Sequence, residues 1–97
     1  MVVLIKKTLS VFAEKHPVSA VSLNNWYDRV KAADWNKLAD MRKEFNNVDY
    51  VGNDRYVFNI KGNDFRLVAM IFFDKRTVFI CFIGTHTEYD KIDCSTI

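Results

Sequence analysis

Three strand-like segments, joined by very short links, leave few topologies open to the second half of this chain. Residues 55–60, 65–73 and 77–84 are rich in β-branched and aromatic side chains, and turn residues separate them. The links have three or four residues, too few for the crossover that parallel strands require. We therefore expect an antiparallel meander, and residues 48–51 could add a short strand before it.

The chain before the meander has the periodicity of helices with one buried face. Apolar side chains recur every three or four positions in three stretches. Pro17 is expected to end the first helix and Asp34 to cap the third. The predicted buried faces consist of Ile5, Leu9, Phe12, Ala13 and His16 in the first helix, Leu23, Trp26, Tyr27, Val30 and Ala33 in the second, and Trp35, Leu38, Met41 and Phe45 in the third. His16 is interpreted as a structural residue at a helix end.

Helices followed by strands predict an α+β fold, with N-terminal helices packed on one face of a C-terminal antiparallel β-sheet. Residues 2–5 could add an edge strand. A chain of 97 residues that is 49% hydrophobic can bury a core without metal or disulfide bonds. We therefore expect one domain over residues 1–97.

The apolar segments do not resemble membrane or secretion signals. The run at residues 67–73 is far shorter than the roughly 20 residues that cross a bilayer. The four apolar residues after Met1 precede the lysines, the reverse of the order in a secretory signal. These features predict a cytoplasmic protein. A net charge of +2 permits a nucleic-acid partner but does not require one.

No metal or cofactor motif is present. The sequence has no HExxH, Walker loop, GxSxG or acidic metal pair. The surroundings of Cys81 and Cys94 do not resemble a metal knuckle or a redox motif. We expect both cysteines to be reduced, one of them buried, and we expect no cofactor.

Arg66 is the residue of the predicted meander that most needs an explanation. Alternation places it on the sheet face that carries Val68, Met70 and Phe72. A guanidinium there could extend to water or pair with Asp64 or Asp90, and these alternatives are the commoner ones. It could also bind a phosphate, because its planar fork of donors matches phosphate oxygens.

His86 follows the last predicted strand. Because residues 65–73 and 77–84 should run antiparallel, Arg66 and His86 should be neighbours although twenty residues separate them. A cation beside an imidazole favours the neutral form, which suits a general base. Without Arg66, an imidazole that caps a turn would be the better interpretation.

The segment after Gly84 could form one helical turn, with Thr85 as N-cap and Glu88 as its capping-box partner. Tyr89 could then stack on a base or donate a proton, and Lys91 could contact a phosphate. Each of these two residues alone is more often a solvated surface residue. As a cluster with Arg66 and Lys61, they favour a functional site.

Residues 56–90 resemble the HigB-type toxins of bacterial type II toxin–antitoxin systems, a branch of the RelE-like superfamily. The resemblance rests on "YVFNI", "GNDFR", "LVAMIFF" and "THTEYD", in order and at similar spacing. The N-terminal third is similar more loosely. Asn63 and Arg66 match one family motif. A second family motif, THxEYD, is matched by Thr85, His86, Glu88, Tyr89 and Asp90.

The resemblance implies a RelE-like fold and a metal-independent mRNA interferase, an endoribonuclease that cuts translated mRNA in the ribosomal A site. It also implies a HigA-like helix-turn-helix antitoxin as partner. Cleavage by the ribose 2′-hydroxyl needs a base, an acid and cations. The hypothesis assigns His86 as general base or acid, Arg66 as phosphate clamp and Tyr89 as stacking or proton-donating group. The RNA-binding residues are predicted to be Lys61, Asn63, Thr85 and Lys91.

Two other functions fit the same residues. One is a non-catalytic module that binds RNA or the ribosome through Arg66, Lys61 and Tyr89. The other is a protein-interaction domain that docks a partner on Met70 and Phe72.

Overall fold

The computed structural model describes residues 1–97. Its strands are β1 (Val2–Leu4), β2 (Val48–Gly52), β3 (Arg55–Ile60), β4 (Phe65–Phe72) and β5 (Thr77–Thr85). Its helices are α1 (Lys6–Lys15), α2 (Ala20–Ala32), α3 (Leu38–Glu44) and α4 (His86–Asp90), with a 3-10 turn at Pro17–Ser19. The predicted α+β fold is confirmed, and the three main strands end within one residue of the predicted positions.

The five strands form one sheet in the order β1-β5-β4-β3-β2. The last four form the predicted antiparallel meander. β1 is the expected edge strand, and it pairs in parallel with the beginning of β5. The sheet therefore consists of a local meander plus one strand from the other end of the chain.

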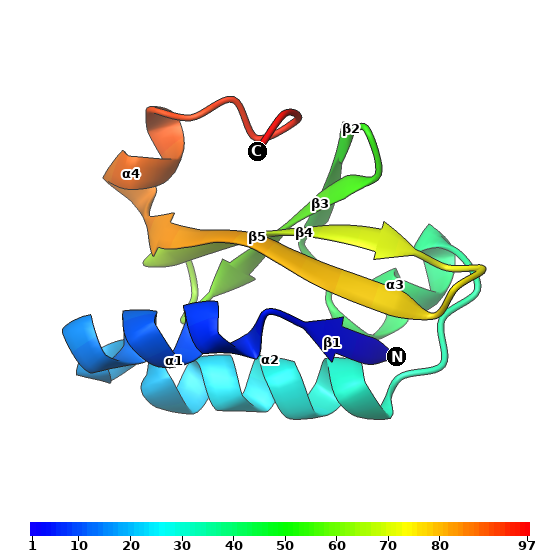
Figure 1. Ribbon diagram of the computed structural model, residues 1–97, viewed down its shortest axis with the longest axis horizontal. Helices are drawn as coiled ribbons and strands as arrows, with labels where there is room; N and C mark the ends of the chain where they lie inside the picture. The colour runs from blue at the N-terminus through cyan, green and yellow to red at the C-terminus, as the bar shows by residue number, and fades with distance from the viewer.

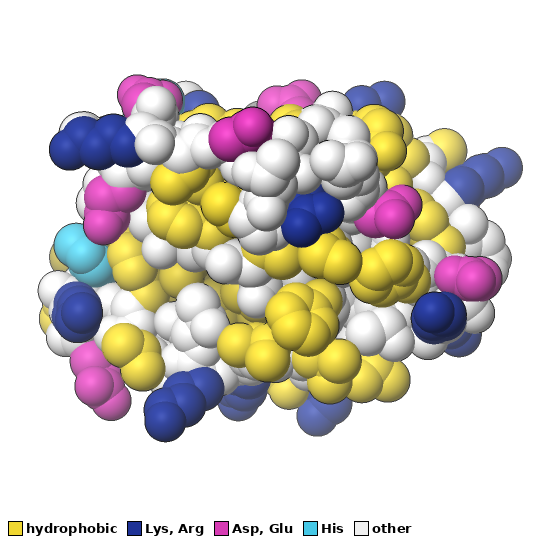
Figure 2. All heavy atoms as spheres, turned by 45° about the horizontal axis from the view of Figure 1, so that its top comes forward, with side chains coloured by type: hydrophobic (Ala, Val, Ile, Leu, Met, Phe, Trp, Pro, Cys, Tyr) yellow, Lys and Arg dark blue, Asp and Glu magenta, His cyan; other side chains and the backbone are white.

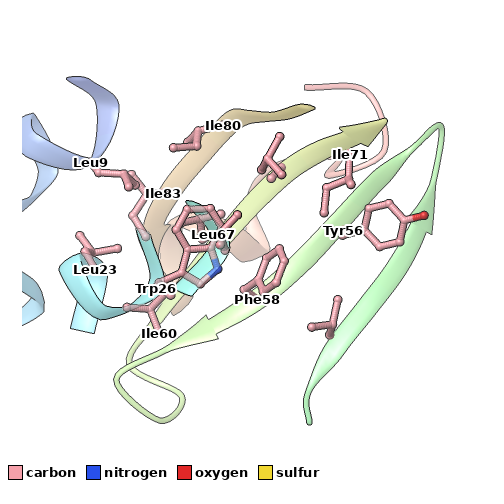
Figure 3. Close-up of a cluster of buried hydrophobic side chains, with 14 of the residues drawn as sticks. Leu9, Leu23, Trp26, Tyr56, Phe58, Ile60, Leu67, Ile71, Ile80 and Ile83 are labelled. Atoms are coloured by element: carbon pink, nitrogen blue, oxygen red, sulfur yellow. The ribbon is translucent and has the colours of Figure 1, made fainter. Parts of the chain in front are cut away.

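The helices are divided between the two faces of the sheet. Figure 1 shows α1 and α2 beneath the sheet, and α4 with the C-terminal segment above it. We call the face toward α1 and α2 the core face and the opposite one the second face. Leu9, Leu23 and Trp26 from the helices pack against Phe58 and Leu67 of the sheet (Figure 3).

The alternation predicted for β4 is confirmed on the core face. Phe65, Leu67, Ala69 and Ile71 are all buried there. Val68, on the second face, is also completely buried. The second face is therefore covered at this position. The C-terminal segment lies over this side of the sheet (Figure 1), and Arg55 and Asn53 donate hydrogen bonds to the backbone of Ile97 and Ser95.

A bulge in β5 corrects one expectation about the cysteines. The register between β4 and β5 shifts between Val68 and Ala69, so that Phe82 and Ile80 are their partners and Cys81 is the extra residue. Cys81 is therefore out of the regular alternation. It is half-buried, as is Cys94, and both are free thiols. The prediction that one of them is buried was wrong.

The third helix begins later than predicted. Its N-cap position is Lys37, without a side-chain cap, and Asp34 instead pairs with Arg76 of the β4–β5 turn. The Asp40 carboxylate accepts a hydrogen bond from the Asn36 backbone, and that bond is the main reason why the pKa of Asp40 lies below its usual value. Asp34 was therefore wrong as a cap, because a tertiary ion pair competes for its carboxylate.

His16 has the structural role expected of it. It ends α1, and its ring stacks on Phe12 with 4.4 Å between the centroids. None of the helices is both long and apolar enough to span a bilayer.

Replacing Leu67 with alanine should lower the free energy of unfolding by about 2–5 kcal/mol. Leu67 is completely buried at the centre of the core, so the change removes apolar contacts and leaves a cavity. Urea denaturation followed by circular dichroism measures the effect. Val21→Ala is a suitable control, because Val21 is 72% exposed and its truncation should change the free energy little.

Candidate active site

The antiparallel pairing of β4 and β5 places Arg66 beside the start of α4. Arg66 is opposite Gly84 in the register, two residues before His86. The Nη2 atom of Arg66 lies 2.7 Å from Nε2 of His86. The predicted contact between these two residues is therefore confirmed.

A capping box fixes the first turn of α4. The Glu88 backbone N–H donates to Thr85 Oγ1 at 3.2 Å, and the Thr85 backbone N–H donates to the Glu88 carboxylate at 2.8 Å. The second bond is the main reason why the pKa of Glu88 is lowered. This cap was predicted, and it holds His86 at the first position of the helix. Thr85, a predicted RNA-binding residue, thus has a structural role in the free protein.

The partner of His86 determines which of its ring nitrogens carries the proton. Arginine can only donate hydrogen bonds, so Nε2 of His86 must accept the one from Arg66. The proton of the neutral ring is then on Nδ1, which lies 3.8 Å from the Asp90 carboxylate. The side chain is 49% exposed. His86 therefore has a lone pair on the atom that faces Arg66 and a carboxylate behind the ring.

Arg66 is held by a residue that the sequence analysis missed. Its Nη1 donates to Oδ1 of Asn59, its register partner on β3. It forms no salt bridge with Asp64 or Asp90, because Lys61 pairs with Asp64 and His86 lies beside Asp90. Two neutral partners leave the positive charge of Arg66 uncompensated, which suits an anionic ligand.

Asn59 could have been found from the sequence once the register was known. The β3–β4 link pairs Ile60 with Phe65, and the next pair along the ladder is Asn59 with Arg66. The register itself depends on the conformation of the link, where Lys61 and Gly62 both have positive φ angles. A link of the same length with another turn would shift the pairing.

Replacing Asn59 with alanine should reduce the rate of RNA cleavage by at least about tenfold, the rate equivalent of one hydrogen bond to a charged group. The guanidinium would lose the acceptor that orients it but keep its charge. Single-turnover cleavage measures the effect. Asn63→Ala is a matched asparagine change in the adjacent turn, and it should reduce the rate less. An unchanged rate for Asn59→Ala would contradict the orienting role.

Tyr89 also lies beside Arg66. The guanidinium carbon is 5.8 Å from the centre of the ring, and the hydroxyl donates a hydrogen bond to Cys94 Sγ at 3.4 Å. Burial, followed by this bond to Cys94, raises the pKa of Tyr89 to about 12. Tyr89 is therefore a protonated donor at neutral pH, and Cys94 is a second residue that sequence analysis missed.

The raised pKa of Tyr89 can be tested by its absorbance. An ordinary tyrosine is mostly ionised at about pH 11, whereas Tyr89 should remain mostly protonated there. The difference in absorbance at about 295 nm between the wild type and Tyr89→Phe should therefore be small at that pH. Cys94→Ala should make it larger, because the protonated hydroxyl loses its acceptor. A full tyrosinate signal from Tyr89 in the folded wild type would contradict the assignment.

The remaining predicted RNA-binding residues are not brought into contact with this cluster. Lys61 and Asn63 lie in the exposed β3–β4 turn, where Lys61 Nζ is 3.3 Å from Asp64. Lys91 ends α4 and is exposed. Their involvement in RNA binding stays a prediction. Figure 2 shows a histidine on the surface near basic and acidic side chains, at one end of this view.

Known proteins have sequences that are similar to this one over most of its length. Residues 19–92 match the family described as HigB_toxin, RelE-like toxic component of a toxin–antitoxin system. An mRNA interferase HigB of Escherichia coli O6:H1 is 35% identical over 82 residues, which cover 82% of this chain and 80% of the relative. An mRNA interferase toxin HigB of Escherichia coli K12 is 33% identical over 88 residues, which cover 88% of this chain and 84% of the relative.

The family match covers more than half of the chain, and it includes every residue of the Arg66, His86 and Tyr89 cluster. The resemblance noted in the sequence is therefore confirmed over α2, α3, the four strands β2 to β5 and α4. The chain belongs to the HigB toxins, the RelE-like toxic components of toxin–antitoxin systems.

Proposed function

We propose that this toxin is an mRNA interferase that cleaves translated mRNA at the ribosomal A site, without a metal ion, and so arrests growth. The observation that carries the proposal is the exposed pair formed by Arg66 and His86, 2.7 Å apart at the end of the sheet. Curated relatives that cover most of the chain are named mRNA interferases, which supports this activity.

The pair suggests how the substrate would activate the site. In the free protein an Arg66 N–H occupies the Nε2 lone pair of His86. A guanidinium binds the charged oxygens of a phosphate more strongly than it binds the nitrogen of a neutral imidazole. Binding of the scissile phosphate would therefore draw Arg66 away and leave Nε2 free to accept a proton.

The cleavage step then uses groups that are already in place. Nε2 of His86 takes the proton of the ribose 2′-hydroxyl, and the 2′-oxygen attacks the adjacent phosphorus. Arg66 stabilises the charge that develops on the phosphate oxygens. The Asp90 carboxylate, 3.8 Å from Nδ1, favours the imidazolium that forms. The bond to the 5′-oxygen breaks, leaving a 2′,3′-cyclic phosphate and a 5′-hydroxyl.

Tyr89 is proposed as a stacking group and a donor to the leaving oxygen. Its high pKa excludes it as a base at neutral pH, but a protonated phenol can donate. Its ring centre lies 5.8 Å from the guanidinium carbon of Arg66, so Tyr89 would lie close to a phosphate that Arg66 binds. Lys61, Asn63, Thr85 and Lys91 are proposed to bind the RNA backbone around this centre.

The ends of the products test the chemistry. Cleavage through the 2′-hydroxyl gives a 5′-hydroxyl end, which a kinase can label directly, and it fails on RNA with a 2′-deoxy or 2′-methoxy group at the cleavage site. A 5′-phosphate end, or cleavage of the 2′-deoxy substrate, would show that water is the nucleophile and overturn the mechanism.

Ribosome dependence is tested separately. The net charge of only +2 favours a site to which the ribosome delivers the message over one that binds free RNA. Cleavage of one mRNA should be compared with and without translating ribosomes, and its 5′ ends mapped to codon positions. Efficient cleavage of the free RNA would contradict the A-site proposal.

A protein that binds RNA or ribosomes without cutting them would give saturable binding and no new ends, and this result would favour the non-catalytic alternative. The proposed antitoxin is a HigA-like protein with a helix-turn-helix domain, encoded beside the toxin. Its expression should relieve the growth arrest.

A further inference from the structure

A surface outside the Arg66, His86 and Tyr89 cluster exposes an unusual amount of apolar side chain. Val2, Leu4, Ile5 and Val11 are all among the large apolar side chains that are at least 40% exposed, and they extend from β1 through the N-cap of α1 to the middle of that helix. Scattered exposed apolar residues need no explanation, but a concentrated set indicates an interaction surface.

A groove of about 500 Å³ opens beside these residues, between α1 and the end of β5. Ile5, Val11, Phe12 and Ile83 form its apolar part. The other lining residues are Lys7, Thr8, Lys15, His16 and Glu88. None of the three residues of the proposed active site lines it.

The charge of the groove favours an acidic occupant. Lys7 and Lys15 line it, and neither forms a salt bridge. Glu88 is the one acid of the lining, and the backbone N–H of Thr85 already binds its carboxylate. Lys15 also contributes to the lowered pKa of Glu88, though less than that bond. Lys7 remains without a compensating charge.

The edge of the sheet is open at the same place. β1 pairs with β5 only over Thr77, Val78 and Phe79, because Ile5 takes a left-handed conformation with φ of 67° and the chain turns into α1. Beyond Phe79, β5 has β4 as its one strand neighbour. Figure 1 shows β1 beside the first part of β5 and α1 beneath the last part. An added strand could continue the line of β1 along this edge.

The spacing along α1 specifies the side chains of such a strand. Lys7 and Lys15 are eight helical residues apart, about 12 Å along the axis, and Val11 lies midway between them. Residues i and i+4 of an extended strand are about 13 Å apart on one face, with residue i+2 between them. The matching pattern is acid, any residue, apolar, any residue, acid.

We propose that the antitoxin docks here with an extended segment of this pattern, which pairs with the β5 edge and faces α1. The two acids would meet Lys7 and Lys15, and the apolar residue would cover Val11. This proposal deepens the partner assignment made above and rests on the toxin having an antitoxin, which its family implies. It does not depend on the proposed cleavage chemistry.

The test uses purified toxin and the protein encoded beside it that relieves growth arrest. The double variant Lys7→Glu/Lys15→Glu should weaken their binding at least about 100-fold by calorimetry, because it places like charges together. The matched control is Lys37→Glu/Lys43→Glu, two exposed lysines around α3, which should bind as the wild type does. Wild-type affinity of Lys7→Glu/Lys15→Glu would overturn the proposal.

Hydrogen exchange tests the strand itself. Amides among residues 80–84 should gain protection in the complex. Protection confined to residues 86–90 would place the antitoxin on the active site instead and overturn the proposal. In cells, Lys7→Glu/Lys15→Glu should still arrest growth but escape rescue by the antitoxin. If even the wild type arrests no growth, the proposed function fails, while the binding result still decides the docking site.

Discussion

Replacing His86 with alanine should abolish growth arrest and slow mRNA cleavage by roughly 10²–10⁴-fold, the usual contribution of a positioned acid or base. The imidazole is the group proposed to take the 2′-hydroxyl proton, and its Nε2 atom lies 2.7 Å from Nη2 of Arg66. The measurement is single-turnover cleavage on translating ribosomes, with growth after induced expression as the cellular readout.

The fold should survive this change, because the side chain is about half exposed and lies outside the core. The melting temperature should therefore stay close to that of the wild type. His16→Gln is a suitable control, since His16 is the other histidine of the chain and its ring stacks on Phe12. His16→Gln should keep its toxicity. Full toxicity of His86→Ala would show that the histidine holds Arg66 without moving a proton.

Replacing Arg66 with alanine should slow cleavage by about 10²–10³-fold, the range found when one preorganised donor to a developing oxyanion is removed. The loss should fall on the rate constant of the cleavage step more than on ribosome binding, because the charge it stabilises is greatest in the transition state. The measurement is the dependence of the single-turnover rate on toxin concentration. This dependence gives the rate constant of cleavage and the affinity for the ribosome separately.

Arg66→Lys distinguishes geometry from charge. A lysine keeps the charge but has no planar fork, so it cannot bind Asn59 and a phosphate in the same arrangement. We expect partial recovery at most. Arg42→Ala on α3 is the matched control, because Arg42 is exposed and its one side-chain hydrogen bond goes to the Val48 carbonyl, at 3.4 Å. Equal rates for Arg66→Lys and the wild type would mean that a point charge is sufficient.

Much of the fold could be predicted because its strongest signals are local. Short links between β-rich segments leave an antiparallel meander as the available topology, and alternation assigns Leu67 and Ile71 to the core face. The capping box at Thr85 is equally local, since its two partners are three residues apart. The contact between Arg66 and His86 was also predictable, because a hairpin brings the start of one strand to the end of the next.

The errors arose where distant segments compete for a residue. Asp34 has the sequence context of a helix cap, but Arg76, 42 residues later, takes its carboxylate. Cys81 has the context of a buried strand residue, but a bulge displaces it. Asn59 and Cys94 were missed because their importance comes from a strand register and from the return of the C-terminal segment across the sheet.

Local sequence signals were therefore sufficient to predict the meander, the helical layer, the pairing of Arg66 with His86 and the family to which they point. Each of these depends on residues close together in the chain or joined by one short turn. The charge and protonation of the site, in contrast, depend on tertiary contacts. The packing of distant segments leaves the charge of Arg66 free, places the His86 proton on Nδ1 and raises the pKa of Tyr89, because protonation depends on burial and on neighbouring groups in space.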